Sequence, residues 1–181
     1  MNNELLTRNF YQLFDMPIAF EVNMDQLQQH YRTLAQTVHP DKYANASDQE
    51  RRISMQQSSW VNKAYQTLKD PIERASYLLQ LKGIDVNLEN ETTMDAAFLM
   101  DQMDLRETLA DVRAQADPLA VLDKELGNVK NTMQKMSEAF STAYEADQIE
   151  DAKECLRKMQ FIQKARNEID VLTAKIEDEL F

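Results

Sequence analysis

Apolar residues near the N-terminus recur at helical spacing and define an amphipathic helix. At intervals of three or four residues the chain carries Leu27, Tyr31, Leu34 and Val38. Residues spaced in this way share one face of an α-helix, which can pack against a neighbouring element. We expect the helix to begin near Asn23 and to stop at His39-Pro40, because the residue before a proline is disfavoured in the α region.

Capping signals predict the helices that follow. Ser47-Asp-Gln-Glu50 has the pattern of a reciprocal capping box, so a second helix should run from it to about Leu68. Asp70-Pro71 supplies an N-cap and a first-turn proline for a third helix, which should end near Leu81. Gly83 then fits the left-handed conformation that often follows the last turn of a helix.

Residues 84–92 show no clear helical stripe, and we predict a linker there between a first domain of residues 1–83 and a second of residues 93–181. Helix starts in the second domain are predicted at residues 92–95, at Asp117-Pro118 and after Asp147. Three long helices with short connections imply an antiparallel three-helix bundle. With only two glycines and four prolines, and many strong helix formers, the composition predicts an all-α protein.

Charge is distributed unevenly along the chain. Residues 1–83 carry nine basic and nine acidic side chains, whereas residues 84–181 carry 11 and 22, so the second half holds the whole net charge of −11. Such a surface repels phosphate backbones and anionic lipid, and we expect neither a nucleic-acid nor a membrane partner. Solubility is the simpler role for most of these carboxylates. Without a signal peptide or a span of about 20 apolar residues, a cytoplasmic protein is expected.

Residues suited to catalysis or metal binding are few. One cysteine, Cys155, and two histidines do not make up the ligand set of a zinc or iron–sulfur site. No nucleophile accompanies His39 and Asp41, and no glycine-rich phosphate loop is present. We therefore expect no enzyme activity, no cofactor and no bound metal, and we interpret Cys155 as an ordinary buried or half-buried helix residue.

The most informative motif is His39-Pro40-Asp41-Lys42, between two predicted antiparallel helices. Pairing of the helices would hold the motif out at the tip of a hairpin. Proline fixes one backbone dihedral, while His39 offers a switchable donor or acceptor and Asp41 an anionic acceptor. The simpler alternative is that Pro40 and Asp41 merely shape an exposed turn.

Longer patterns surround this motif. Downstream stand Asn62-Lys-Ala-Tyr65-Gln-Thr-Leu68 and Asp70-Pro-x-x-Arg74-Ala-x-Tyr77, and residues 10–80 resemble a J-domain in order and spacing. The opening Asn9-Phe-Tyr-Gln-Leu-Phe14 and the segment Phe98–Glu107 resemble the HscB family, the J-proteins dedicated to bacterial iron–sulfur cluster assembly. This likeness spans nearly the whole chain. It implies an L-shaped arrangement of an N-terminal J-domain hairpin and a C-terminal three-helix client-binding bundle.

The resemblance also implies a co-chaperone role. In such proteins the His39-Pro40-Asp41 loop stimulates the ATPase of a DnaK-type chaperone, here the specialised HscA, and the second domain delivers the scaffold protein IscU. The helix before the loop departs from many J-domains, because Arg32 is its only arginine or lysine. Long-range attraction to the chaperone should therefore be weak, and docking through Arg32 and Lys42 is a hypothesis.

One helix of the second domain carries two apolar faces. At about 100° per residue, one direction collects the predicted core residues Met94, Phe98, Leu105, Leu109 and Val112. Leu99, Met100 and Met103 point elsewhere and should be partly exposed, as an adaptable binding patch. The family resemblance implies that the scaffold binds to Leu99, Met100, Met103, Asp104, Glu107 and Phe161.

Three points stay open at the level of sequence. The patch could instead pack against the first domain. Phe161 could equally belong to the core of the bundle. Trp60 could face the hairpin, the second domain or solvent.

Overall fold

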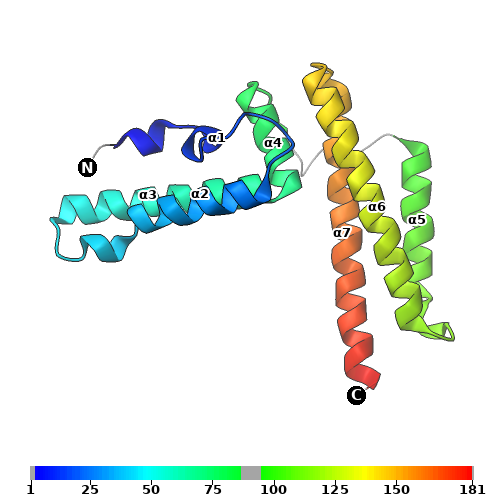
Figure 1. Ribbon diagram of the computed structural model, residues 1–181. Helices are drawn as coiled ribbons and strands as arrows, with labels where there is room; N and C mark the ends of the chain where they lie inside the picture. The colour runs from blue at the N-terminus through cyan, green and yellow to red at the C-terminus, as the bar shows by residue number, and fades with distance from the viewer. Residues whose placement is uncertain (1–2, 87–94, 181) are drawn as a thin grey trace. The chain divides into compact units, whose positions relative to one another are not determined.

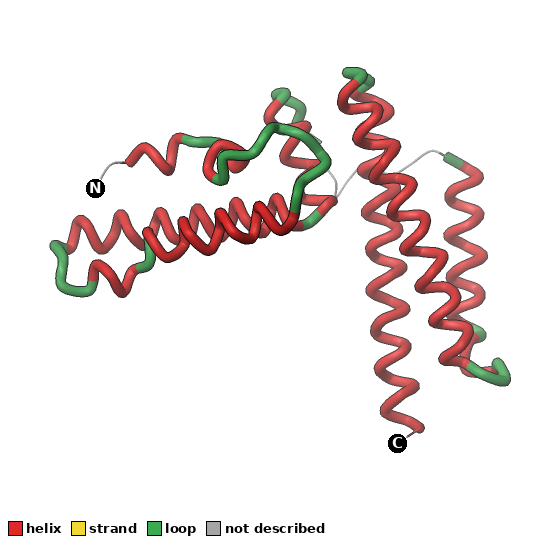
Figure 2. Tube along the Cα trace, in the orientation of Figure 1, coloured by secondary structure: helices red, strands yellow, loops and turns green. Residues whose placement is uncertain are grey.

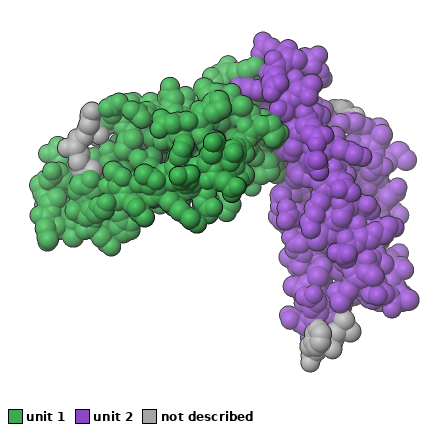
Figure 3. All heavy atoms as spheres, viewed as in Figure 1, with its two compact units in different colours: residues 1–84 green, residues 85–181 purple. Residues whose placement is uncertain are grey.

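The computed structural model describes residues 3–86 and 95–180, and every regular element within these ranges is helical (Figures 1 and 2). This confirms the predicted all-α class. The chain divides into two compact units, residues 1–84 and residues 85–181 (Figure 3). Within the described ranges, no helix combines the length and the apolar character that a membrane span requires.

The first unit is built around one long helix. Its elements are η1 (Asn3–Thr7), α1 (Phe10–Leu13), α2 (Met24–Thr37), η2 (Pro40–Tyr43), α3 (Asp48–Lys69) and α4 (Pro71–Leu81). The predicted caps are present: Ser47 and Glu50 form the capping box of α3, and the Asp70 side chain accepts two backbone N–H bonds at the start of α4. Gly83 has the left-handed φ of +77° after α4.

Helices α2 and α3 form an antiparallel hairpin with α3 at the centre of the unit, where it also contacts η1, α1, η2 and α4. Leu27 of α2 and Val61 and Leu68 of α3 are fully buried. Burying a side chain of this size stabilises the fold by about 1.5–3 kcal/mol. On the hairpin surface the Tyr31 and Tyr65 rings stack at 4.0 Å, and the Tyr31 hydroxyl donates to Asn62 Oδ1 at 2.9 Å.

An aromatic cluster packs the N-terminal segment against α3 and α4. The Phe10 ring stacks on Tyr77 at 4.3 Å and meets Trp60 edge-on at 4.9 Å. The Phe10 backbone N–H donates to the Tyr77 hydroxyl at 3.0 Å, which ties α1 to α4. Trp60, unassigned from the sequence, thus lies against the aromatic residues of the first unit.

The second unit is an up-down-up helical bundle. It consists of α5 (Ala96–Ala110), η3 (Val112–Ala114), α6 (Pro118–Glu145) and α7 (Ile149–Leu180). Helix α6 runs antiparallel to α7 along its length, whereas α5 runs parallel to α7 (Figure 1). One core cluster contains Phe98, Leu109, Val112, Leu122, Val129, Ile162, Ile169 and Ile176.

Two details of α5 refine the sequence prediction. Asp95 is its N-cap, and its side chain accepts the Phe98 N–H at 3.1 Å. The helix ends at Ala110, so Val112 reaches the core from the short turn η3 rather than from α5 itself. Met94 and residues 87–92 of the predicted linker lie outside the described residues.

Candidate functional site

The His-Pro-Asp motif stands exposed at the end of the α2–α3 hairpin. His39 is the N-cap of η2, and its Nδ1 accepts the Asp41 N–H at 3.2 Å. An accepting Nδ1 assigns the proton of the neutral ring to Nε2, which leaves an N–H donor for a partner. The side chain of His39 is 56% exposed and that of Asp41 is 91% exposed. The tip therefore presents one donor and one carboxylate to solvent.

Hydrogen bonds from α3 and η2 hold the end of α2 next to this tip. The hydroxyl of the fully buried Ser54 donates to the carbonyl oxygen of Val38 at 3.0 Å, directly before His39. The Tyr43 hydroxyl donates to the Thr37 carbonyl at 3.4 Å. Ser54 was not predicted from the sequence, although its spacing of seven residues from the buried Val61 places it on the same face of α3.

Both predicted docking cations lie beside the tip. Arg32 and Lys42 are exposed, and together with His39 they line one hollow on the outer face of α2. The remaining lining residues are Tyr31, Ala35 and Gln36. Such a surface suits an apolar side chain of a partner that is flanked by acidic groups.

The second candidate site is the outer face of α5. Met100 is 65% exposed and Met103 is 61% exposed, while Leu99 is half-buried. We call these three residues the α5 patch. The exposed carboxylates Asp104 and Glu107 lie on the same helix within two turns of it. The arrangement matches the predicted exposure and combines adaptable apolar side chains with negative charge.

Phe161 of α7 divides its surface between core and solvent. Its ring meets the buried Phe98 edge-on, with centroids 6.2 Å apart, and it packs against the core cluster while remaining half-buried. Of the two roles left open by the sequence, the structure places Phe161 partly in the core and leaves part of its surface accessible.

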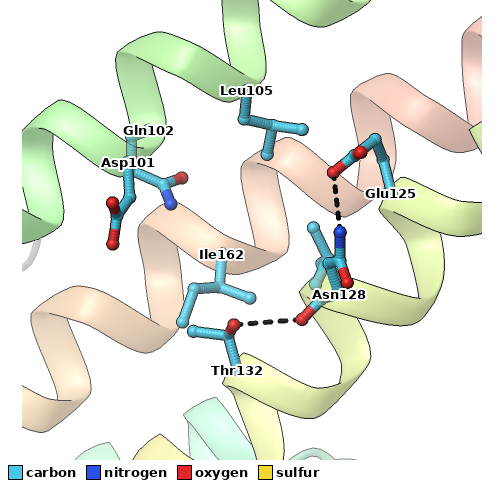
Figure 4. A pocket seen from close by; sticks show the side chains of 8 residues that line it. Asp101, Gln102, Leu105, Glu125, Asn128, Thr132 and Ile162 are labelled. Carbon is cyan, nitrogen blue, oxygen red and sulfur yellow. Dashed lines mark hydrogen bonds between the residues drawn. The ribbon is translucent and has the colours of Figure 1, made fainter.

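The opposite flank of α5 borders a hollow between α5, α6 and α7 (Figure 4). Asp101 and Gln102 of α5 face it across from α6, where Asn128 Nδ2 donates to Glu125 Oε2 at 3.0 Å. The Thr132 hydroxyl donates to the Asn128 carbonyl, also at 3.0 Å. The side chains of Leu105, Val129 and Ile162 also line the hollow, so its lining mixes polar and apolar groups.

Cys155 is half-buried on α7, as predicted, and burial raises the pKa of its thiol. The raised pKa disfavours the thiolate, which is the reactive and metal-binding form. Among the residues that the structure describes, no three His, Cys, Asp or Glu side chains come together as a metal site.

Comparison with known proteins matches both units. Residues 9–77 match the family model described as the DnaJ domain, and residues 94–170 match the HSCB C-terminal oligomerisation domain. A co-chaperone protein HscB homolog from Colwellia psychrerythraea is 40% identical over 176 residues, covering 96% of this chain and 98% of the relative.

Solved structures agree with this. The chaperone HscB from Vibrio cholerae superposes with a TM-score of 0.84 at 38% identity, covering 96% of this chain and 100% of that one. The human co-chaperone protein HscB superposes with a TM-score of 0.82 at 33% identity, covering 91% and 82% of the two chains. Since likeness at this level of identity extends over both units, the chain belongs to the HscB family of J-domain co-chaperones.

Proposed function

We propose that this protein stimulates the ATPase of a specialised DnaK-type chaperone, HscA, and delivers the iron–sulfur scaffold protein IscU to it. It does so without catalytic activity of its own. One observation carries the proposal: the His39–Asp41 tip and the α5 patch are both exposed, and they belong to different compact units. Two partners can then bind to separate surfaces of one chain.

The tip acts by binding the ATP-hydrolysing conformation of the chaperone more tightly than its other states, because only differential affinity shifts a conformational equilibrium. Asp41 accepts a charge-assisted hydrogen bond from a cationic group of the chaperone, worth about 1.5–3 kcal/mol before desolvation is counted. His39 donates through Nε2, while Arg32 and Lys42 flank the contact. The buried Ser54–Val38 bond supports the tip from behind.

The α5 patch binds the scaffold through its apolar side chains. Burial of an exposed methionine contributes about 1.5–3 kcal/mol, and Met100 and Met103 both have most of their surface available for this. Asp104 and Glu107 select a partner with basic groups around an apolar centre. The accessible part of Phe161 extends the same contact onto α7.

Single-turnover ATP hydrolysis tests the proposal. Purified HscA is preloaded with ATP, and the hydrolysis rate is measured with this protein, with IscU, and with both together. We expect synergy between the two. His39→Gln should lower the stimulation by about tenfold, as loss of one hydrogen bond worth about 1.4 kcal/mol implies. IscU binding to this variant, measured by calorimetry, should be unchanged.

The triple variant Leu99→Ala, Met100→Ala, Met103→Ala should show the reverse, with IscU binding lost and stimulation in the absence of IscU retained. If the patch instead packed against the J-domain, its truncation would lower the unfolding free energy and leave IscU affinity intact. A folded variant of either kind that loses both activities contradicts a two-site adaptor.

A further inference from the structure

Lys158 of α7 lies at a junction with the start of α5. Its Nζ lies 2.7 Å from Asp95 Oδ2 and 3.9 Å from Glu154 Oε1. It also lies 5.7 Å from the centroid of the Phe98 ring. Only 16% of the Lys158 side chain is exposed. The position of a lysine side chain this well buried is set by its contacts with neighbouring side chains.

Asp95 carries out two tasks with one carboxylate. Its Oδ1 accepts the Phe98 N–H and caps α5, while its Oδ2 accepts from Lys158. The first turn of α5 is thereby bonded to α7 at the point where Phe98 enters the core and touches Phe161. These contacts at the start of α5 fix the rotation of the helix about its own axis. Leu99 follows Phe98, and its side chain points about 100° further around the helix.

Besides the core packing of Phe98, Leu105 and Leu109, α5 has few contacts that constrain its rotation. Its close backbone contacts are with α7 and η3, and the hollow lined by Asp101 and Gln102 lies between it and α6 (Figure 4). At its far end a second ion pair joins Arg113 of η3 to Glu179 of α7. That pair lies beyond the end of α5 and has both side chains about half exposed, at 49% and 57%.

We propose that Asp95 and Lys158 are positioning residues for the scaffold site: without contacting the scaffold, they hold α5 in the rotation that presents Leu99, Met100 and Met103. This inference rests on the function proposed above. It adds a determinant of affinity that lies outside the contact surface.

The test measures IscU affinity by calorimetry on the full chain. Asp95→Asn removes the charge but keeps a good N-cap, so it isolates the ion pair from the cap. Lys158→Met removes the ammonium and keeps an apolar side chain of similar length. If either change leaves α5 correctly rotated in about one molecule in ten, the apparent Kd rises about tenfold. The double variant should bind no more weakly than either single one, because both remove the same contact.

Two controls separate positioning from general stability. Lys158→Arg should restore affinity to near that of the unchanged protein, since arginine can also bond Asp95. Arg113→Met should leave the Kd unchanged although it also removes an ion pair between the α5 region and α7. Stimulation of the HscA ATPase without IscU should be unaffected in every variant.

Outcomes distinguish this inference from the function on which it rests. If the unchanged protein binds IscU and the triple alanine variant does not, the scaffold site stands. Asp95→Asn and Lys158→Met binding within about twofold of the unchanged protein would then overturn the positioning role alone. Loss of affinity in Arg113→Met equal to that in Lys158→Met would also overturn it. Failure of the unchanged protein to bind IscU overturns both.

Discussion

At the scale of single residues, the tip depends on a buried side chain that no partner touches. Ser54→Ala removes the donor to the Val38 carbonyl and leaves that acceptor buried without its bond. We expect the unfolding free energy to fall by about 1–3 kcal/mol, measured by urea denaturation. ATPase stimulation should fall with it, because the backbone before His39 loses its anchor. Ser59→Ala, at an exposed position of α3, is the matched control and should match the unchanged protein in both assays.

Replacement of each glycine by alanine should change the unfolding free energy in opposite directions. Gly127 lies inside α6, and a Cβ there would meet no atom within 4 Å. Gly127→Ala should therefore raise the unfolding free energy by about 0.5–1 kcal/mol, because glycine is a poor helix residue. Gly83→Ala should lower it by about 1–2 kcal/mol, since φ of +77° is strained for any residue with a Cβ. Urea midpoints with equal slopes would measure both. Shifts of the same sign would contradict this account.

At the scale of elements, the α5–α7 junction predicts a particular dependence on pH. The bond from Lys158 is the largest cause that lowers the pKa of Asp95, and the Phe98 N–H adds to it. A carboxyl group whose pKa is lower in the folded state than in the unfolded state stabilises the fold. This stabilisation is complete at pH values above the unfolded-state pKa, which is about 3.9 for aspartate. That contribution is lost as pH falls from about 4 through the folded pKa.

The corresponding measurement compares thermal unfolding of the unchanged protein and of Asp95→Asn from neutral to acid pH. The Tm difference between them should be constant above about pH 5 and should shrink below about pH 4. Glu50 and Glu179, whose pKa values are also lowered by their partners, titrate in both proteins and cancel in the difference. A Tm difference that grows toward acid pH would contradict the ion pair.

The same helix shows which features a sequence can predict. Capping residues and apolar spacing predicted the long helices α2 to α7, because both act within one or two turns of the chain. The short elements η1, α1, η2 and η3 were not predicted. The two apolar faces of α5 were assigned from the angular positions of their residues, and the exposed side chains of Met100 and Met103 agree with that assignment. The contact from Lys158 to Asp95 joins residues 63 positions apart. It depends on how α5 aligns along α7, which no local pattern encodes. The bond from Ser54 to the Val38 carbonyl was not predicted for a related reason, since it depends on how α3 pairs with α2.

At the scale of the whole molecule, charge separates the two units. The first carries as many basic as acidic side chains, and the second holds the entire excess of negative charge. A chaperone approaching the J-domain therefore meets a unit with little net field, so long-range steering contributes little to its association rate. Under the proposed function, we therefore expect Arg32 and Lys42, which line one hollow with His39, to supply most of the electrostatic part of chaperone binding.

Reversal of both charges, Arg32→Glu with Lys42→Glu, should therefore lower HscA stimulation by about tenfold, the effect of about 1.4 kcal/mol. The matched control, Arg52→Glu with Lys63→Glu, changes the net charge of the same unit equally, but these exposed residues do not line the hollow beside the tip. It should retain most of the stimulation. Single-turnover rates at about 0.05 M and about 0.5 M salt complete the test, because a local contact persists where a long-range field is screened. If both double variants lost stimulation equally, and high salt abolished the difference from the unchanged protein in both, the effect would be due to net charge and not to the hollow beside His39.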